Sequence, residues 1–170
     1  MSTFQERMLR AIKLDPSLYE EVEADPTAIY QAMGVVVLSG IAAGIGSIWT
    51  VGFKAIISIT IAAIIGWFIW AGLTYFIGVK FIPEPQTQSN IGELLRTIGF
   101  SSSPGIIRVL GIIPGLTWIT SFIGSIWMLI AMVIAVRQAL DYKSTLRAVV
   151  VCAVGWIIQM LLMMLLYYIF

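Results

Sequence analysis

The sequence predicts an all-α protein, a polytopic transmembrane helical bundle of five spans with a cytoplasmic amphipathic helix at the N-terminus. Hydrophobic residues make up 59% of the 170 residues and charged residues only 11%, whereas ordinary soluble domains carry about 25% charged residues. Apolar stretches of the length that crosses a bilayer, about 20 residues each, occupy nearly all of the chain beyond residue 30. The basic residues also divide unequally between the two sides that five spans create.

Residues 1–29 form the expected cytoplasmic region. An apolar side recurs there at helical spacing, on Phe4, Met8, Leu9 and Ile12. This pattern indicates a helix over 3–14, which either lies on the membrane surface or docks on the rest of the protein. We expect no cleavable signal peptide, because both charge signs occur and an apolar core is missing.

Two Asp-Pro dipeptides follow, Asp15-Pro16 and Asp25-Pro26. Each offers an N-cap carboxylate and then the proline that the first helical position favours. They predict one helix over 16–24 and a second that begins at Asp25-Pro26 and continues into the membrane.

Residues 30–170 form the expected transmembrane domain. Its first span is predicted over 30–50, where Gly40 and Gly44 make a small-xxx-small pair that lets another helix approach closely. The second span is predicted over 55–79, and a polar connection that cannot bury itself follows it. Asn90 is the candidate N-cap of a short helix over 91–98.

The third span, 97–113, is expected to be short and broken near Ser101 to Gly105, because glycines, serines and a proline interrupt it. The apolar run over 104–136 measures 33 residues, about 50 Å as a helix, which exceeds one crossing. A fourth span over 116–137 and a fifth over 147–169 therefore complete the prediction.

Five spans place the N-terminal region and the connections at 80–96 and 137–147 on one side. That side holds eight basic residues: Arg7, Arg10, Lys13, Lys80, Arg96, Arg137, Lys143 and Arg147. The other side holds Lys54, so the positive-inside rule predicts a cytoplasmic N-terminus and a C-terminus outside.

The composition argues against catalysis and against bound metals or cofactors. The chain has no histidine, its sole cysteine, Cys152, lies in the last apolar segment, and the carboxylate pairs are confined to Glu20 to Asp25. A phosphate-binding glycine loop is missing as well. A net charge of +1 gives no basis for nucleic-acid binding.

Three arginines lie closest to the hydrocarbon: Arg96, Arg108 and Arg137. Ionisable residues inside a membrane are functional candidates, and arginines near span ends also snorkel to lipid phosphates. Glu93 and Asp141 are the nearest candidate partners. Glu93 could pair with Arg96 at i and i+3, and Asp141 could pair with Arg137 or Lys143.

Three segments carry a family resemblance: "LDPSLYEEV", "NIGELLRTIGFSSSPG" and "IWMLIAMVIAVRQAL". Their order resembles the Yip family of five-span membrane proteins, named for interaction with Rab-type GTPases, in its prokaryotic branch. "GFSSSPG", with Gly99, Phe100 and Pro104, is similar to that family's motif before a proline.

The resemblance implies a cytoplasmic N-terminus, five spans, oligomerisation and, in eukaryotic members, a part in vesicle traffic and membrane shaping. We do not expect GTPase binding, because only "LDPSLY" stands where eukaryotic members carry an aspartate-leucine-glycine-proline type motif. We expect a prokaryotic plasma membrane as the location.

Two functions compete. The first is a non-catalytic membrane organiser that self-associates through the Gly40 and Gly44 face, or joins other membrane proteins, and binds lipid headgroups. The second is a small transporter, channel or lipid-moving protein that uses the broken third span and Arg108. The candidate lipid- or partner-binding residues are Glu93, Arg96, Gly99, Phe100, Pro104, Arg108, Arg137 and Asp141.

Overall fold

The computed structural model describes residues 2–169, apart from the side chains of 162, 163 and 165–169. Every regular element over these residues is helical. The elements are α1 (Phe4–Ile12), α2 (Pro16–Ala24), α3 (Ala28–Gly46), α4 (Ile48–Val51), α5 (Lys54–Thr74), the π-helix η1 (Tyr75–Phe81), α6 (Ile91–Phe100), the 3-10 helix η2 (Ser103–Ile112), α7 (Thr117–Ala139) and α8 (Thr145–Ile169).

Three helices are long and apolar enough to cross a membrane. They are Ala28–Gly46, Lys54–Phe81 and Thr117–Ala139, and two shorter apolar helices cover Ser103–Ile112 and Thr145–Leu161. The protein is therefore a helical membrane protein with several candidate spans. The count of five spans stays a prediction, because the third and fifth fall in the shorter segments.

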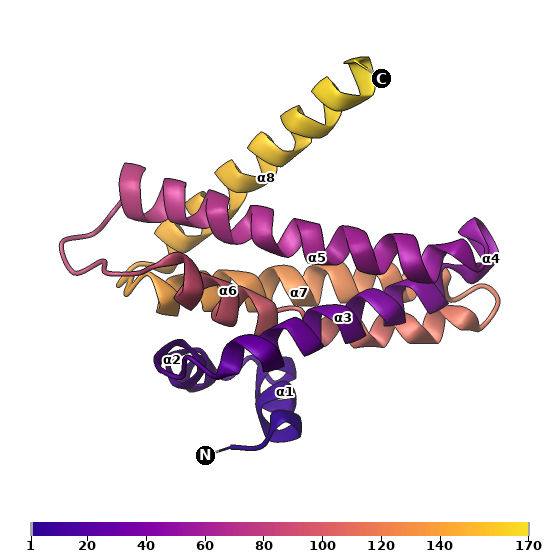
Figure 1. The fold of residues 1–170 in the computed structure, drawn as a ribbon, viewed down its shortest axis with the longest axis horizontal. Helices are drawn as coiled ribbons and strands as arrows, with labels where there is room; N and C mark the ends of the chain where they lie inside the picture. Colours follow the sequence, from indigo (N-terminus) through magenta and orange to yellow (C-terminus); the bar gives the residue numbers. More distant parts are fainter. Residues whose placement is uncertain (1, 170) are drawn as a thin grey trace.

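The long helices lie side by side and run along the longest axis of the molecule (Figure 1). α3 packs against α5 and η2, and η2 packs against α7. α1 runs across the bundle, whereas α8 starts beside the end of α7 and then diverges from the other helices.

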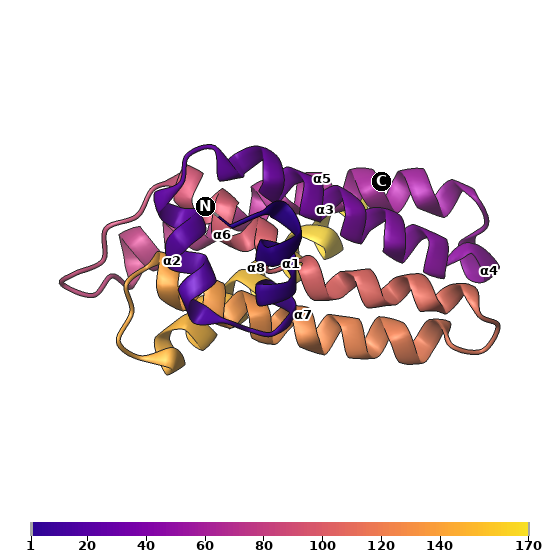
Figure 2. The same cartoon turned by 90° about the horizontal axis from the view of Figure 1, so that it is seen from below.

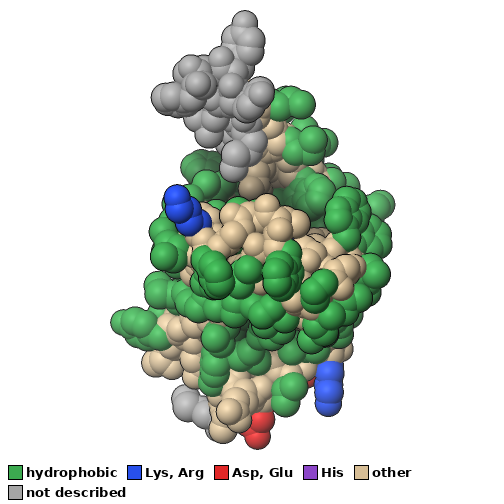
Figure 3. Space-filling view, turned by 90° about the vertical axis from the view of Figure 1, so that its right-hand side faces the viewer, with side chains coloured by type: hydrophobic (Ala, Val, Ile, Leu, Met, Phe, Trp, Pro, Cys, Tyr) green, Lys and Arg blue, Asp and Glu red, His purple; other side chains and the backbone are tan. Residues whose placement is uncertain are grey.

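The connections gather at two opposite ends of the bundle (Figure 2). At the end that holds α2, the Gln138 amide donates to Glu20 at 2.8 Å and the Thr87 hydroxyl to the Leu140 carbonyl at 3.0 Å. At the opposite end, Trp49 Nε1 donates to the Ile112 carbonyl at 2.6 Å. That second end presents mostly hydrophobic side chains (Figure 3).

The two Asp-Pro dipeptides act differently. Asp15 caps α2 as predicted, because its side chain accepts from the Ser17 amide with Pro16 at the start of the helix. Asp25 does not cap the next helix, which is a correction. α3 begins at Ala28, and the Asp25 carboxylate accepts from the amide and hydroxyl of Thr27.

α1 is docked on the bundle through a buried arginine. Arg7, 2% exposed, donates to Glu21 at 3.0 Å, to Asp25 at 2.8 Å and to Gln31 at 2.9 Å. The indole of Trp127 also donates to the carbonyl of Ile12 at 3.0 Å. Phe4 and Met8 of the apolar side also pack against the hydrophobic core, so α1 is docked on the rest of the protein by polar and apolar contacts together.

Gly40 and Gly44 pack against α5 of the same chain. A Cβ atom added to Gly40 would lie 2.9 Å from Thr60 Cα, and one added to Gly44 would lie 2.5 Å from Ile56 Cα. The close helix approach predicted for this pair is present. The expected use of the face for self-association needs correction, because α5 already covers it.

The segment predicted as the third span is interrupted after α6. Ser101 and Ser103 donate their hydroxyls to the carbonyls of Ile98 and Phe100, both at 2.7 Å. These bonds satisfy backbone oxygens that an α-helix would have paired, which is how a broken helix is tolerated at membrane depth. Pro104 then opens η2, where its missing N–H costs little.

Candidate functional site

A cavity of about 390 Å³ lies at this interruption, where α3, α5, α6, η2, α7 and α8 meet. Its size falls within the range of small-ligand pockets, roughly 300–1,000 Å³. Polar side chains form one part of the lining: Ser39, Ser101, Ser102, Arg108, Ser125 and Gln159. The rest of the described lining is apolar, so the cavity is amphipathic.

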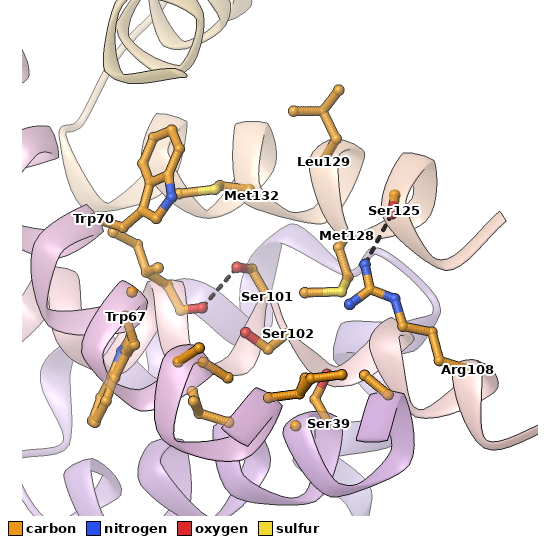
Figure 4. A pocket seen from close by; sticks show the side chains of 18 of the residues that line it. Ser39, Trp67, Trp70, Ser101, Ser102, Arg108, Ser125, Met128, Leu129 and Met132 are labelled. Carbon is orange, nitrogen blue, oxygen red and sulfur yellow. Dashed lines mark hydrogen bonds between the residues drawn. The ribbon is translucent and has the colours of Figure 1, made fainter. Parts of the chain in front are cut away.

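Arg108 is the charged group of this cavity. It extends from η2 toward α7, where it donates to the Ser125 hydroxyl at 2.9 Å (Figure 4). Its Nε atom is buried and has no hydrogen-bond partner among the described residues. Gly124 leaves room for the side chain, because a Cβ atom there would stand 3.0 Å from Arg108 Cγ.

The sequence places every acidic residue away from this arginine along the chain. The nine carboxylates belong to residues 6–25, to Glu84 and Glu93 in the connection before α6 and its first turn, and to Asp141 after α7. The cavity lining contains no carboxylate among the described residues. Since a charge in largely apolar surroundings is costly without a partner, the Arg108 guanidinium is suited to an anionic group from a ligand.

The apolar wall comes from α5 and α7. On α5, Ile59, Ala62 and Gly66 line the cavity, and a Cβ atom at Gly66 would meet nothing within 4 Å. On α7 the lining residues are Met128, Leu129 and Met132, whose flexible side chains adapt to irregular shapes. These six residues border a groove between α5 and α7, which has open space beside Gly66.

Arg96 is placed away from the cavity, contrary to its expected role at a lipid or partner. The side chain is 9% exposed, and its Nε donates to the Val22 carbonyl at 2.9 Å. A second donor reaches the Glu23 carbonyl. Arg96 therefore satisfies carbonyls at the C-terminal end of α2, where a cation also complements the helix dipole.

Glu93 and Arg96, which could have paired, have other partners in the structure. Glu93 forms a capping box with Asn90, in which the Asn90 side chain accepts from the Glu93 amide at 3.0 Å and Glu93 accepts from the Asn90 amide at 3.0 Å. The prediction of Asn90 as N-cap is confirmed. Glu93 thus acts at the start of its own helix.

The motif residues before the interruption serve packing. Phe100 is fully buried, Pro104 is buried at the start of η2, and a Cβ atom on Gly99 would lie 2.7 Å from Ala32 Cβ. Gly99 therefore permits the close approach of α6 to α3. In the structure these three residues shape the interruption, and none of them lines the cavity.

Arg137 and Asp141 do not pair, which corrects a second expected ion pair. Arg137 Nε donates to the Tyr142 carbonyl at 3.3 Å. Asp141 is exposed in a turn with φ of +53°, and its amide donates to the Gln138 carbonyl. Arg137 lies in the last turn of α7 and Asp141 in the connection that follows it.

Sequence reasoning singled out Arg108 but missed its partner. Ser125 lies one turn after Ser121 on α7 and next to the buried Gly124. Small and polar residues at this spacing were a detectable sign that another helix approaches α7 closely. For Ser39 and Trp70, which also line the cavity, the sequence around them gave no comparable indication.

The chain matches a known protein family. The model of the Yip1 domain matches residues 16–167, nearly the whole chain. No curated protein and no solved structure gives a significant match.

Proposed function

The chain belongs to the Yip1 domain family, and from this premise we propose that it is a non-catalytic multi-pass membrane protein that organises the bilayer by binding anionic lipid headgroups at Arg108. One observation carries the proposal. Arg108 lies in an amphipathic cavity whose described lining holds no carboxylate. A lipid phosphate would supply the missing counter-ion, and charge-assisted bonds to a guanidinium are among the stronger hydrogen bonds.

The proposal includes the location and orientation. We place the protein in a prokaryotic plasma membrane, on the resemblance to that branch, with the N-terminus cytoplasmic. The basic residues support this orientation, because five spans leave eight of the ten on the side of the N-terminal region. Self-association is also expected, and contacts between copies would use lipid-facing surfaces such as the ridge of Ile57, Ile61 and Ile65 on α5.

Native mass spectrometry of the purified protein in lipid nanodiscs tests the headgroup site. We expect retained phosphatidylglycerol in preference to phosphatidylcholine, and loss of that preference in Arg108→Gln. Arg147→Gln is the matched control, because it also removes one positive charge but affects a residue that pairs with Glu84 outside the cavity. Equal retention of both lipids by the unaltered protein would end the proposal.

A second function, lipid or solute movement, is supported by the polar side chains that Ser101, Arg108 and Gln159 bring to one cavity from three different elements. A polar path through apolar spans is what a headgroup needs to cross. Liposomes that contain the protein should then show headgroup flipping or anion leak, reduced in Arg108→Ala. Inactivity in both assays would leave the organiser function as the remaining candidate.

A further inference from the structure

We infer that the ligand of the Arg108 cavity is a membrane phospholipid with one net negative charge, held with its phosphodiester at Arg108 and one acyl chain in the groove between α5 and α7. This inference rests on the proposed headgroup site and adds the class of lipid and the path of its chain. Three features of the cavity carry it: the donors of one guanidinium, the small residues of α5, and the position of α8.

The guanidinium sets the charge and shape of the headgroup. It offers five N–H donors, and its bond to Ser125 is the one that the described residues account for. The two non-bridging oxygens of a phosphodiester match the forked arrangement of the guanidinium N–H donors that Ser125 does not occupy. A single cation balances a single negative charge, so a monoanionic diester fits better than a dianionic phosphomonoester. Neutral donors and acceptors nearby, on Ser102 and Gln159, suit an alcohol headgroup.

The wall beside Arg108 sets the path of the chain. Ile59, Ala62 and Gly66 follow one another at helical spacing along α5, with Leu129 and Met132 opposite on α7. A Cβ atom at Gly66 would meet no neighbouring atom within 4 Å, so the groove has space beside this residue. An alkyl chain that filled this space would remove the apolar surface of the groove from water.

The described part of α8 covers the groove incompletely. Trp156 and Gln159 from α8 line the cavity, and Gly155 lies against Trp70, where a Cβ atom would stand 2.7 Å from Trp70 Cζ3. Beyond this contact α8 diverges from α5 and α7 (Figure 1). Trp156 lines the cavity and is also exposed, so we place the exit of the lipid chain beside this residue, with the bilayer as the source of the ligand.

The test separates the chain from the headgroup. Gly66→Leu fills the groove and keeps Arg108, whereas Gly72→Leu places the same side chain at another open position of α5 that does not line the cavity. Binding of fluorescent dioleoyl phosphatidylglycerol is measured in detergent micelles. We expect about tenfold weaker binding in Gly66→Leu, which corresponds to about 1.4 kcal/mol, and unchanged binding in Gly72→Leu.

Competition identifies the ligand class. Unlabelled dioleoyl phosphatidylglycerol should displace the probe, whereas glycerophosphoglycerol, which lacks acyl chains, phosphatidylcholine and oleate should displace it at least about tenfold less well. Stronger displacement by oleate would overturn the phospholipid assignment in favour of a fatty acid. Equal displacement by glycerophosphoglycerol would overturn the chain path.

The two proposals fail in different ways. Binding that Arg108→Gln abolishes but Gly66→Leu leaves intact would refute the chain path and keep the headgroup site. Binding that Arg108→Gln leaves intact would refute both. If Gly66→Leu does not fold, as judged by size-exclusion chromatography and thermal unfolding, Ala62→Leu fills the next position of the same groove and replaces it.

Discussion

The Arg108 side chain lies across the backbone of Gly124, so closely that a Cβ atom at residue 124 would stand 3.0 Å from Arg108 Cγ and 3.1 Å from Nε. This contact aligns the guanidinium with Ser125, the next residue of α7. The glycine therefore contributes to the cavity although it makes no polar contact. Its replacement should alter the position of the charge without removing it.

Gly124→Val should weaken binding of phosphatidylglycerol by about tenfold, because the new side chain pushes Arg108 away from Ser125. Overpacking of this kind also costs about 1–3 kcal/mol of stability. Lipid retention in nanodiscs measures the first effect and thermal unfolding the second. Gly72→Val, in open space on α5, is the control, and equal lipid retention by the two variants would contradict the role assigned to Gly124.

Arg108→Met should stabilise the lipid-free protein while abolishing its lipid preference. An arginine at the centre of a membrane helix costs about 2.5–3.5 kcal/mol, which the substitution removes. Loss of the hydrogen bond to Ser125 offsets only about 1 kcal/mol of this stabilisation. We expect an increase of about 1–3 kcal/mol, measured by unfolding in delipidated detergent micelles. A lower stability of this variant would show that Arg108 serves the packing of the bundle.

Arg7→Gln should release α1 and α2 from the bundle. Breaking a buried ion pair by removing one partner costs about 3–5 kcal/mol, and Arg7 holds both Glu21 and Asp25. Hydrogen exchange should rise over residues 4–24 and stay unchanged in α7. Lys13→Gln, at an exposed position of the same region, is expected to leave exchange as it is. Unaltered protection in Arg7→Gln would disprove this anchoring role.

Glu23→Gln should stabilise the protein above neutral pH. Burial, reinforced by the charges of Glu93, Asp141 and Glu20 and opposed by Arg96, raises the pKa of Glu23 to about 7. A carboxyl with a raised pKa in the folded state favours folding while protonated, so stability falls as the pH rises from 4.5 through 7. Thermal unfolding of the two proteins should coincide at pH 4.5 and separate by pH 8.

Glu21 acts in a different pH range and provides the internal check. Burial opposes its ionisation, but hydrogen bonds from Ser2, Arg10 and Arg7 outweigh burial and lower the pKa to about 2. Its contribution is therefore complete above pH 4.5 and lost only as the pH falls toward 2. A Glu23→Gln difference that grew below pH 4.5 would conflict with this assignment.

Gly44→Ala should destabilise the monomer, because the added Cβ atom would stand 2.5 Å from Ile56 Cα and 2.9 Å from the Ala55 carbonyl oxygen. Backbone atoms cannot yield as a flexible side chain does, so α3 and α5 have to separate. Gly72→Ala should be neutral or stabilising by up to about 1 kcal/mol through helix propensity. A change of oligomeric state with unchanged thermal stability in Gly44→Ala would restore this face to self-association.

The sequence predicted several local features correctly because they depend on neighbours in the chain. Asp15 and Asn90 cap the helices that follow them, since an N-cap needs only the amides of the next few residues. The interruption between Phe100 and Ser103 likewise follows from serines and a proline in a short stretch. The prediction that Asp25 caps a helix was wrong, because an Asp-Pro dipeptide also occurs in turns and because Arg7 binds the Asp25 carboxylate.

The sequence by itself determined the class of this protein. Its composition is that of a largely apolar, helical membrane protein, and the order of its residues places the acidic ones outside the long apolar segments. Only the tertiary structure decided which of its arginines remain available. Arg96 and Arg108 have similar settings in the sequence, yet one donates to carbonyls of α2, 73 and 74 residues away along the chain, and the other faces a cavity built by six elements. The partners of a long side chain depend on which helices pack beside it, and helix packing depends on close contacts such as Gly44 on Ile56 that link distant segments.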